Sequence, residues 1–221
     1  QWRNQQISIK FNKASHAHPI NLQHSSVDAS KFKYAGAEPP KHMRELRNKE
    51  VIIIAGPSAS GKSYLMRQLI TKKKNKFKET IYHALNIKYN KSRSGISISA
   101  LKNLNKKPEH SRKLRKKIIF IHFDLTSRQQ KEKRRLLLLT AKHCKTIKVL
   151  TVKTPFNTWR ERMQNRIQMN PSVKPKNGAT QIFNNSKYFN IFAKLQYKYV
   201  YKEWAKFIRK MEPEINISFD N

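Results

Sequence analysis

The chain of 221 residues has one cysteine, five glycines and only 13 acidic residues. The single Cys144 cannot form an internal disulfide, so a reducing, cytoplasmic environment is the simplest expectation. Long apolar runs are also missing. The longest, among them Val51–Ala55 and Ile118–Phe123, fall far short of the roughly 20 residues that span a bilayer. The sequence therefore predicts no membrane span.

Negative charge is scarce: 48 lysines and arginines stand against 13 aspartates and glutamates, a net charge of +35. Such a surplus creates a field that attracts polyanions. A nucleic acid or another polyanionic partner would explain it, and anionic small substrates such as nucleotides would explain part of it. The alternative is a compositional bias toward Lys, Asn and Ile, in which most lysines only solvate the surface. We favour that bias for most of the surplus and keep a polyanion partner open.

Two of the five glycines stand in one G-x-x-x-x-G-K-S motif, directly after the apolar run Val51–Ala55 and before an expected helix, Tyr64–Ile70. A loop in this setting points consecutive backbone N–H groups at phosphate oxygens, and the helix N-terminus adds its positive dipole end. Lys62 would reach the β- and γ-phosphates of ATP or GTP, and the Ser63 hydroxyl would bind Mg²⁺. The residues expected to bind the nucleotide here are Gly56, Ser58, Ala59, Ser60, Gly61, Lys62, Ser63 and Tyr64.

The pattern of apolar residues predicts one α/β domain, 49–221, behind a basic N-terminal extension, 1–48, that holds at most a strand or two. Expected strands are Val51–Ala55, Thr80–His83, Ile118–Asp124, Ile147–Val152 and Ile215–Phe219. Expected helices are Tyr64–Ile70, Gln129–His143, Phe156–Gln168 and Lys187–Met211, with an ambiguous polar region at Asn86–Lys117. Strands that alternate with helices indicate a mostly parallel sheet with helices on both faces.

Asp124 is the candidate carboxylate of the site. The chain has three aspartates, and this one stands at the end of a predicted core strand, where open α/β sheets bind their ligands. It would bind Mg²⁺ or accept a proton from the attacking hydroxyl. The alternative is a capping role, with Asp124 accepting from the amides of Thr126 or Ser127. His122, two residues earlier, is expected to be a core histidine rather than a catalyst.

Three arginines, Arg160, Arg162 and Arg166, lie in the predicted helix that follows Thr154-Pro155. Arg162 and Arg166 are four residues apart and therefore share a helix face. Phosphoryl transfer spreads negative charge over the transferred group, and arginines can neutralise it. We assign Arg162 and Arg166 to catalysis and Arg160 to nucleotide binding, with solvated surface arginines as the alternative.

These segments carry a resemblance. The loop Gly56–Ser63 resembles that of guanylate kinases, and Val149–Pro155 running into Trp159–Arg166 is similar to the strand-Pro-helix-Arg unit of P-loop nucleoside and nucleotide kinases. Phe123-Asp124-Leu125 occupies the place of the family's acidic strand end. The resemblance implies a P-loop NTPase three-layer fold with a lid at about 167–186. The segment that grips GMP in guanylate kinases has no clear counterpart in Asn86–Lys117.

The expected function is that of an ATP-dependent phosphotransferase, which moves the γ-phosphoryl group of a Mg-nucleotide to a small acceptor such as a nucleoside, a nucleotide or a similar metabolite. One alternative is a nucleic-acid-associated P-loop NTPase or polynucleotide end-kinase, favoured by the charge. Another is a non-catalytic nucleotide-binding protein that acts on a partner chain. A GTPase is disfavoured because the sequence has no Asn-Lys-x-Asp motif.

Overall fold

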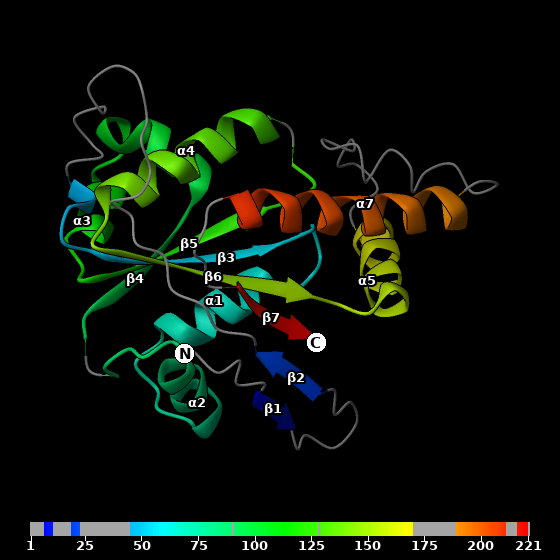
Figure 1. Ribbon diagram of the computed structural model, residues 1–221, viewed down its shortest axis with the longest axis horizontal. Coiled ribbons are helices and arrows are strands. Elements are labelled where there is room, and N and C mark those ends of the chain that lie inside the picture. The colour runs from blue at the N-terminus through cyan, green and yellow to red at the C-terminus, as the bar shows by residue number, and fades with distance from the viewer. Residues whose placement is uncertain are drawn as a thin grey trace.

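The computed structural model describes residues 7–10, 19–22, 45–89, 91–127, 129–169, 189–210 and 216–220 (Figure 1). Its strands are β1 (Ile7–Lys10), β2 (Pro19–Leu22), β3 (Glu50–Gly56), β4 (Arg93–Ser97), β5 (Ile118–Asp124), β6 (Thr146–Lys153) and β7 (Asn216–Asp220). Its helices are α1 (Lys62–Ile70), α2 (Lys76–Ala84), the 3₁₀ helix η3 (Ile98–Lys106), α3 (Pro108–Leu114), α4 (Gln130–His143), α5 (Phe156–Met169) and α7 (Phe189–Lys210).

The central sheet has five strands in the order β4-β5-β3-β6-β7, and every neighbouring pair is parallel. The central strand β3 therefore has β5 on one side and β6 on the other. Its register with β5 pairs Gly56 with Asp124, so these two strands end level with each other. The expected parallel α/β architecture is confirmed.

Helices cover both faces of this sheet (Figure 1). On one face, α1 and α2 pack on Ile52 and Ile54 of β3 and Phe120 of β5. On the other face, α4 and α7 pack on the alternate residues, including Ile53 of β3 and Phe123 of β5. Because both faces are covered, each central strand is a nearly continuous apolar run, as the sequence predicted.

The prediction of a strand at Thr80–His83 was wrong, because these residues lie in helix α2. The side chain of Asn75 accepts a hydrogen bond from the Lys78 N–H at 2.8 Å and caps the helix N-terminus. The buried side chains of α2 then follow helical spacing, at Lys78, Ile81 and Tyr82. Ile81 and Tyr82 favour strands locally, but the N-terminal cap and the packing of these side chains against the sheet stabilise the helix instead.

The polar region Asn86–Lys117 contains β4, η3 and α3. Strand β4 escaped prediction because its inner positions are small or polar. Gly95 leaves room for the Met66 side chain, and the buried Ser94 hydroxyl donates to the Lys113 carbonyl at 2.5 Å. The contacts of these residues, and not their hydrophobicity, stabilise this segment as a strand.

The remaining segments agree with the expected order of elements. Helix α1 begins at Lys62, two residues before the expected start at Tyr64. In the N-terminal extension, β1 and β2 form an antiparallel pair, and β2 lies beside β7 (Figure 1). Of the predicted lid, residues 167–169 end α5 and the rest lies outside the described residues.

None of the described helices combines the length and the apolar composition that are needed to cross a bilayer.

Candidate functional site

The candidate site lies at the carboxyl ends of β3 and β5. After β3 the chain runs to the edge strand β4, returns through β5 to one side of β3, and then crosses to β6 on the other side. Open α/β sheets bind ligands in the crevice at such a reversal of strand order. A pocket of about 800 Å³ opens there. The loop after β3, the first turns of α1, the end of β5 and helix α5 form its walls.

The loop between β3 and α1 is shaped by its two glycines. Gly61 has a φ of 92°, a left-handed conformation that side chains other than glycine's rarely adopt. A Cβ on Gly56 would lie 2.4 Å from the Ser60 hydroxyl oxygen and 3.1 Å from the Val152 carbonyl oxygen. The loop therefore folds back tightly on itself between β3 and β6. The first N–H groups of α1, which lack intrahelical acceptors, are left beside the pocket.

Lys62 is buried at the first position of α1, with 5% of its surface exposed. Its ammonium donates to the Pro57 carbonyl at 2.9 Å and lies 3.7 Å from Asp124 Oδ2. Burial lowers the pKa of Lys62, the nearby Asp124 charge opposes this, and Arg166 lowers the pKa further. The amine thus reaches across the loop to Asp124, which the sequence assigned to the same site.

Asp124 lies at the end of β5 and accepts hydrogen bonds on both oxygens. The Thr126 N–H and hydroxyl donate to Oδ1 at 2.9 and 2.7 Å, and the Ser58 hydroxyl donates to Oδ2 at 2.9 Å. Burial raises the pKa of Asp124, but the Lys62 charge and these hydrogen bonds outweigh burial and bring the pKa below its usual value. Asp124 therefore accepts from the Thr126 N–H, as the capping alternative expected, but it caps no helix, because α4 begins only at Gln130.

Helix α5 is fastened to the loop by its first turns. Pro155 directly precedes it, and the Thr154 hydroxyl donates to the Ser60 carbonyl at 2.9 Å. The buried indole of Trp159 donates from Nε1 to the Ser58 carbonyl at 2.7 Å. Arg162 Nη1 lies 3.5 Å from the same Ser60 carbonyl. Loop and helix thus form one hydrogen-bonded unit.

Two of the three predicted arginines, Arg162 and Arg166, line the pocket, as their shared helix face predicted. Arg160 does not line it. Its position two residues from Arg162 points it to another side of the helix. The assignment of Arg160 to nucleotide binding therefore has no support in the geometry of this pocket.

The aromatic residues of α7 hold the end of β6, from which α5 starts. Trp204 Nε1 donates to the Thr151 hydroxyl oxygen at 3.0 Å, and the Tyr201 hydroxyl donates to the Val152 carbonyl at 2.6 Å. The Tyr197 hydroxyl donates to the Thr154 carbonyl. These hydrogen bonds join α7 to the end of β6 and to the residue before α5.

Among the other predicted loop residues, Ser58, Ala59, Gly61 and Ser63 line the pocket together with Tyr64. Gly56 and Ser60 do not line it. Gly56 lies beneath the loop, and Ser60 is fully buried and supplies the carbonyl that α5 binds. Their contribution is to the shape of the loop.

The sequence missed two residues of the pocket, His122 on β5 and Arg67 on α1. Burial, together with the charge of Lys62, lowers the pKa of His122 to about 4, so the imidazole is neutral at pH 7. Its Nδ1 is buried and has no hydrogen-bond partner in the described part of the chain. The same-face spacing of His122 with Asp124, and of Arg67 with Ser63, was the available signal.

The described residues contain no group of three or more His, Cys, Asp or Glu that could hold a metal ion by themselves. Asp124 is the pocket's carboxylate, and the Ser63 hydroxyl stands at the start of α1. A small set of oxygen donors suits Mg²⁺, which keeps several waters and is commonly bound through one or two protein groups plus phosphates.

No family model and no curated protein matches the sequence. The assignment of a function therefore depends on the residues of the site.

Proposed function

We propose that this chain is a P-loop phosphotransferase, which moves the γ-phosphoryl group of ATP or GTP to a small acceptor. The observation that carries the proposal is the meeting of Lys62, Asp124 and the α5 arginines around one tight, glycine-flanked loop at the reversal of the strand order. A lysine, a carboxylate and arginines are the groups that phosphoryl transfer needs for positioning and charge neutralisation. The fold accordingly would be a three-layer P-loop NTPase fold.

On the donor side, the amides of the loop and of the first turn of α1 would bind the phosphates. Lys62, which donates to the Pro57 carbonyl, would turn its ammonium to the β- and γ-phosphate oxygens. Arg162 and Arg166 would neutralise the charge that spreads over the transferred group. All of these side chains line the same pocket.

Ser63 and Asp124 are the residues that would hold Mg²⁺, and the bound ion would neutralise phosphate oxygens. The lowered pKa of Asp124 keeps the carboxylate ionised, which suits a metal ligand better than a proton acceptor. In the transfer, the acceptor oxygen would form its bond to the γ-phosphorus as the bond from the γ-phosphorus to the bridging oxygen breaks. The hydroxyl proton leaves late in such a loose transition state and would pass to solvent water, so no strong base is needed.

The acceptor would lie against α1 and β5, on the side of the pocket away from α5. There Arg67 and Tyr64 project from α1, and the neutral His122 offers an Nδ1 that has no hydrogen-bond partner among the described residues. A neutral imidazole can bind a hydroxyl group without adding charge. Arg67 would favour an acceptor that carries an anionic group near that hydroxyl.

The test is a phosphotransfer screen with γ-labelled ATP and GTP. Its acceptors are nucleosides, nucleotides, phosphorylated sugars and oligonucleotide 5′ ends, and Lys62→Ala is the control. Labelled product from one acceptor class, lost in Lys62→Ala at unchanged circular dichroism, supports the proposal. Equal turnover by Lys62→Ala would exclude it.

Nucleotide binding must be measured beside turnover. Tight binding of ATP without transfer to any acceptor class would favour a non-catalytic nucleotide-binding protein. Transfer to oligonucleotide ends alone would identify a polynucleotide end-kinase. Absence of both binding and transfer would contradict a nucleotide site at Gly56–Ser63.

A further inference from the structure

The opposite edge of the sheet, where the strands begin, gathers lysines and arginines from four separate segments. The segments lead into β3, β4, β5 and β6, which are adjacent in the sheet. The exposed cations of these segments are Arg47, Lys88, Arg115, Lys116, Lys117, Lys142 and Lys145. We call this surface the amino-end face. It lies at the far end of the strands from the pocket.

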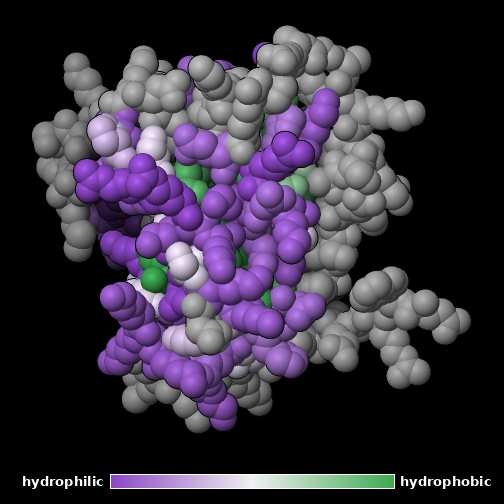
Figure 2. Space-filling view, turned by 90° about the vertical axis from the view of Figure 1, so that its left-hand side faces the viewer, coloured by the Kyte–Doolittle hydropathy of each residue, from purple (hydrophilic) through white to green (hydrophobic). Residues whose placement is uncertain are grey.

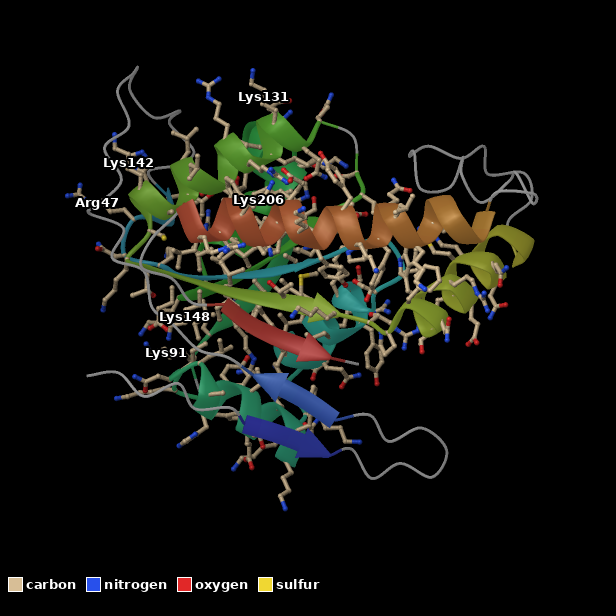
Figure 3. All side chains as sticks on the ribbon, turned by 45° about the vertical axis from the view of Figure 1, so that its right-hand side comes forward. Arg47, Lys91, Lys131, Lys142, Lys148 and Lys206 are labelled. Atoms are coloured by element: carbon tan, nitrogen blue, oxygen red, sulfur yellow. The ribbon has the colours of Figure 1, made fainter. Side chains whose placement is uncertain are left out.

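Exposed carboxylates are scarce in the described part of these segments. In the described part of the four segments, Glu45 is the one exposed acidic residue, and Glu50 is already paired with Lys91. Figure 2 looks onto this face, where the described surface is almost entirely hydrophilic. In Figure 3, Arg47, Lys91, Lys142 and Lys148 lie along this same side.

Some of the basic side chains outside these segments have partners. Lys74, Lys113 and Lys206 form ion pairs with glutamates, and Arg93 donates to the carbonyls of Tyr89 and Thr71. By contrast, the run Arg115, Lys116 and Lys117 is exposed at the tight connection between α3 and β5. Part of the positive charge surplus of the chain therefore lies on this surface.

We propose that the amino-end face binds the phosphate backbone of a nucleic-acid duplex without reading its sequence. The four strand ends span about 14 Å at the usual separation of neighbouring strands. Over that length a duplex carries on the order of eight phosphate charges. The exposed cations of the face are comparable in number and come from the connections into four adjacent strands, so their charge is similar to that of a duplex over this length.

Single strands and membranes fit the face less well. The exposed large hydrophobic residues of the described chain are Tyr64, Leu195 and Tyr199, and none lies in the four segments. Single-strand binding uses aromatic side chains on which bases stack, and the face has none exposed. Peripheral membrane binding usually adds an inserted apolar side chain to the electrostatic attraction, and the face lacks that as well.

The experiment measures binding of the full chain to a fluorescent duplex of about 20 base pairs by anisotropy, over salt concentrations from about 50 to 200 mM. The test variant is Arg115→Gln/Lys116→Gln/Lys117→Gln. The matched control is Lys194→Gln/Lys198→Gln/Lys202→Gln, which removes the same charge from exposed positions on α7. Circular dichroism checks that both variants fold.

We expect the test variant to bind at least about tenfold more weakly at low salt, with a log–log salt slope smaller by about 2 to 3. The control should keep the slope of the wild type. Equal effects of the two variants, or no duplex binding by the wild type, would overturn the proposal. Tighter binding to oligo(dT), or to vesicles with phosphatidylserine, would overturn it in favour of the other ligand.

Lys62→Ala should bind the duplex as well as the wild type does, because Lys62 is buried at the other end of the strands. Duplex binding therefore tests this face independently of the phosphotransferase proposal. Loss of duplex binding in Lys62→Ala would assign the nucleic acid to the pocket and contradict a separate face.

Discussion

The two ends of one parallel sheet hold positive charge in different ways. At the carboxyl ends, Lys62 is buried and held between the Pro57 carbonyl and Asp124. At the amino ends, Arg115, Lys116 and Lys117 are exposed. A buried charge is stable only when its partners are placed accurately, whereas exposed charges act through their number and the field that they produce. Phosphotransfer at the carboxyl ends should therefore depend on the exact placement of side chains. Duplex binding at the amino ends should depend only on the number of charges.

Charge-conserving substitutions provide the strongest contrast between the two ends. Lys62→Arg keeps the charge, but a planar guanidinium cannot replace a compact ammonium in this buried space. We expect phosphotransfer to fall by about 10³-fold. Lys116→Arg/Lys117→Arg should leave duplex affinity and its salt slope unchanged. Turnover and anisotropy measured on both variants check this, and an active Lys62→Arg would contradict the geometric dependence of the carboxyl end.

The second prediction adds a methyl group at Gly56 to test whether the close packing of the loop is needed for ATP binding. In Gly56→Ala the new Cβ would collide with Ser60 and approach the Val152 carbonyl, so the loop must shift. Overpacking of this kind costs about 1–3 kcal/mol, and we expect ATP affinity to fall by about tenfold or more. Isothermal titration measures this affinity.

Gly95→Ala is the matched control for that methyl group. Its Cβ would lie 2.9 Å from Met66 Sδ, which belongs to a flexible side chain that can move aside. ATP affinity should therefore stay near that of the wild type. Equal losses in the two variants would mean that general destabilisation, and not the shape of the loop, lowers the affinity.

The third prediction concerns pH and the partly buried His122. Its folded-state pKa of about 4 lies below the ordinary value of 6.5. Between these values the unfolded chain binds a proton that the folded chain does not, so folding stability decreases as the pH falls from 6.5 toward 4. The loss can reach about 3 kcal/mol.

Urea unfolding of the wild type and of His122→Gln from neutral to acid pH measures this effect. The variant lacks the titrating group, so its stability should decrease less over that interval. Identical pH dependence in the two proteins would show that His122 is not kept neutral by burial. The exposed cations of the amino-end face are the same in both proteins and cannot produce this difference.

Local signals account for the parts of the structure that the sequence predicted. Strands β3, β5 and β6 are apolar runs, and the Gly-Lys-Ser motif and Pro155 mark helix starts. The local pattern placed Asp124 at the carboxyl end of a core strand, where open α/β sheets bind their ligands. These inferences need no knowledge of distant contacts.

The features that the sequence did not predict depend on distant contacts. Strand β4 is defined by Met66 packing on Gly95 and by the Lys113 carbonyl that binds Ser94. The entry of His122 and Arg67 into the site depends on which faces of β5 and α1 turn to the pocket. The amino-end face combines residues from four segments, so no single run in the sequence reveals it.

The smallest expected effect compares two tryptophans that are both buried. Trp159→Phe removes the hydrogen bond to the Ser58 carbonyl of the loop, and Trp204→Phe removes the hydrogen bond to Thr151 on β6. Each variant leaves a buried acceptor without its donor, which should lower the free energy of unfolding by about 1–2 kcal/mol. Urea denaturation of both variants measures this loss.

Only Trp159 contacts the loop directly, so only Trp159→Phe should also weaken ATP binding, by about threefold, since the loop is then held less firmly. Trp204→Phe, with a similar loss of stability, serves as the control in the same titration. If both variants bind ATP equally weakly, general stability governs the site. If Trp159→Phe binds ATP as the wild type does, the hydrogen bond from α5 to the loop does not contribute to ATP affinity. In that case only Lys62 and Gly56 make the site depend on exact geometry.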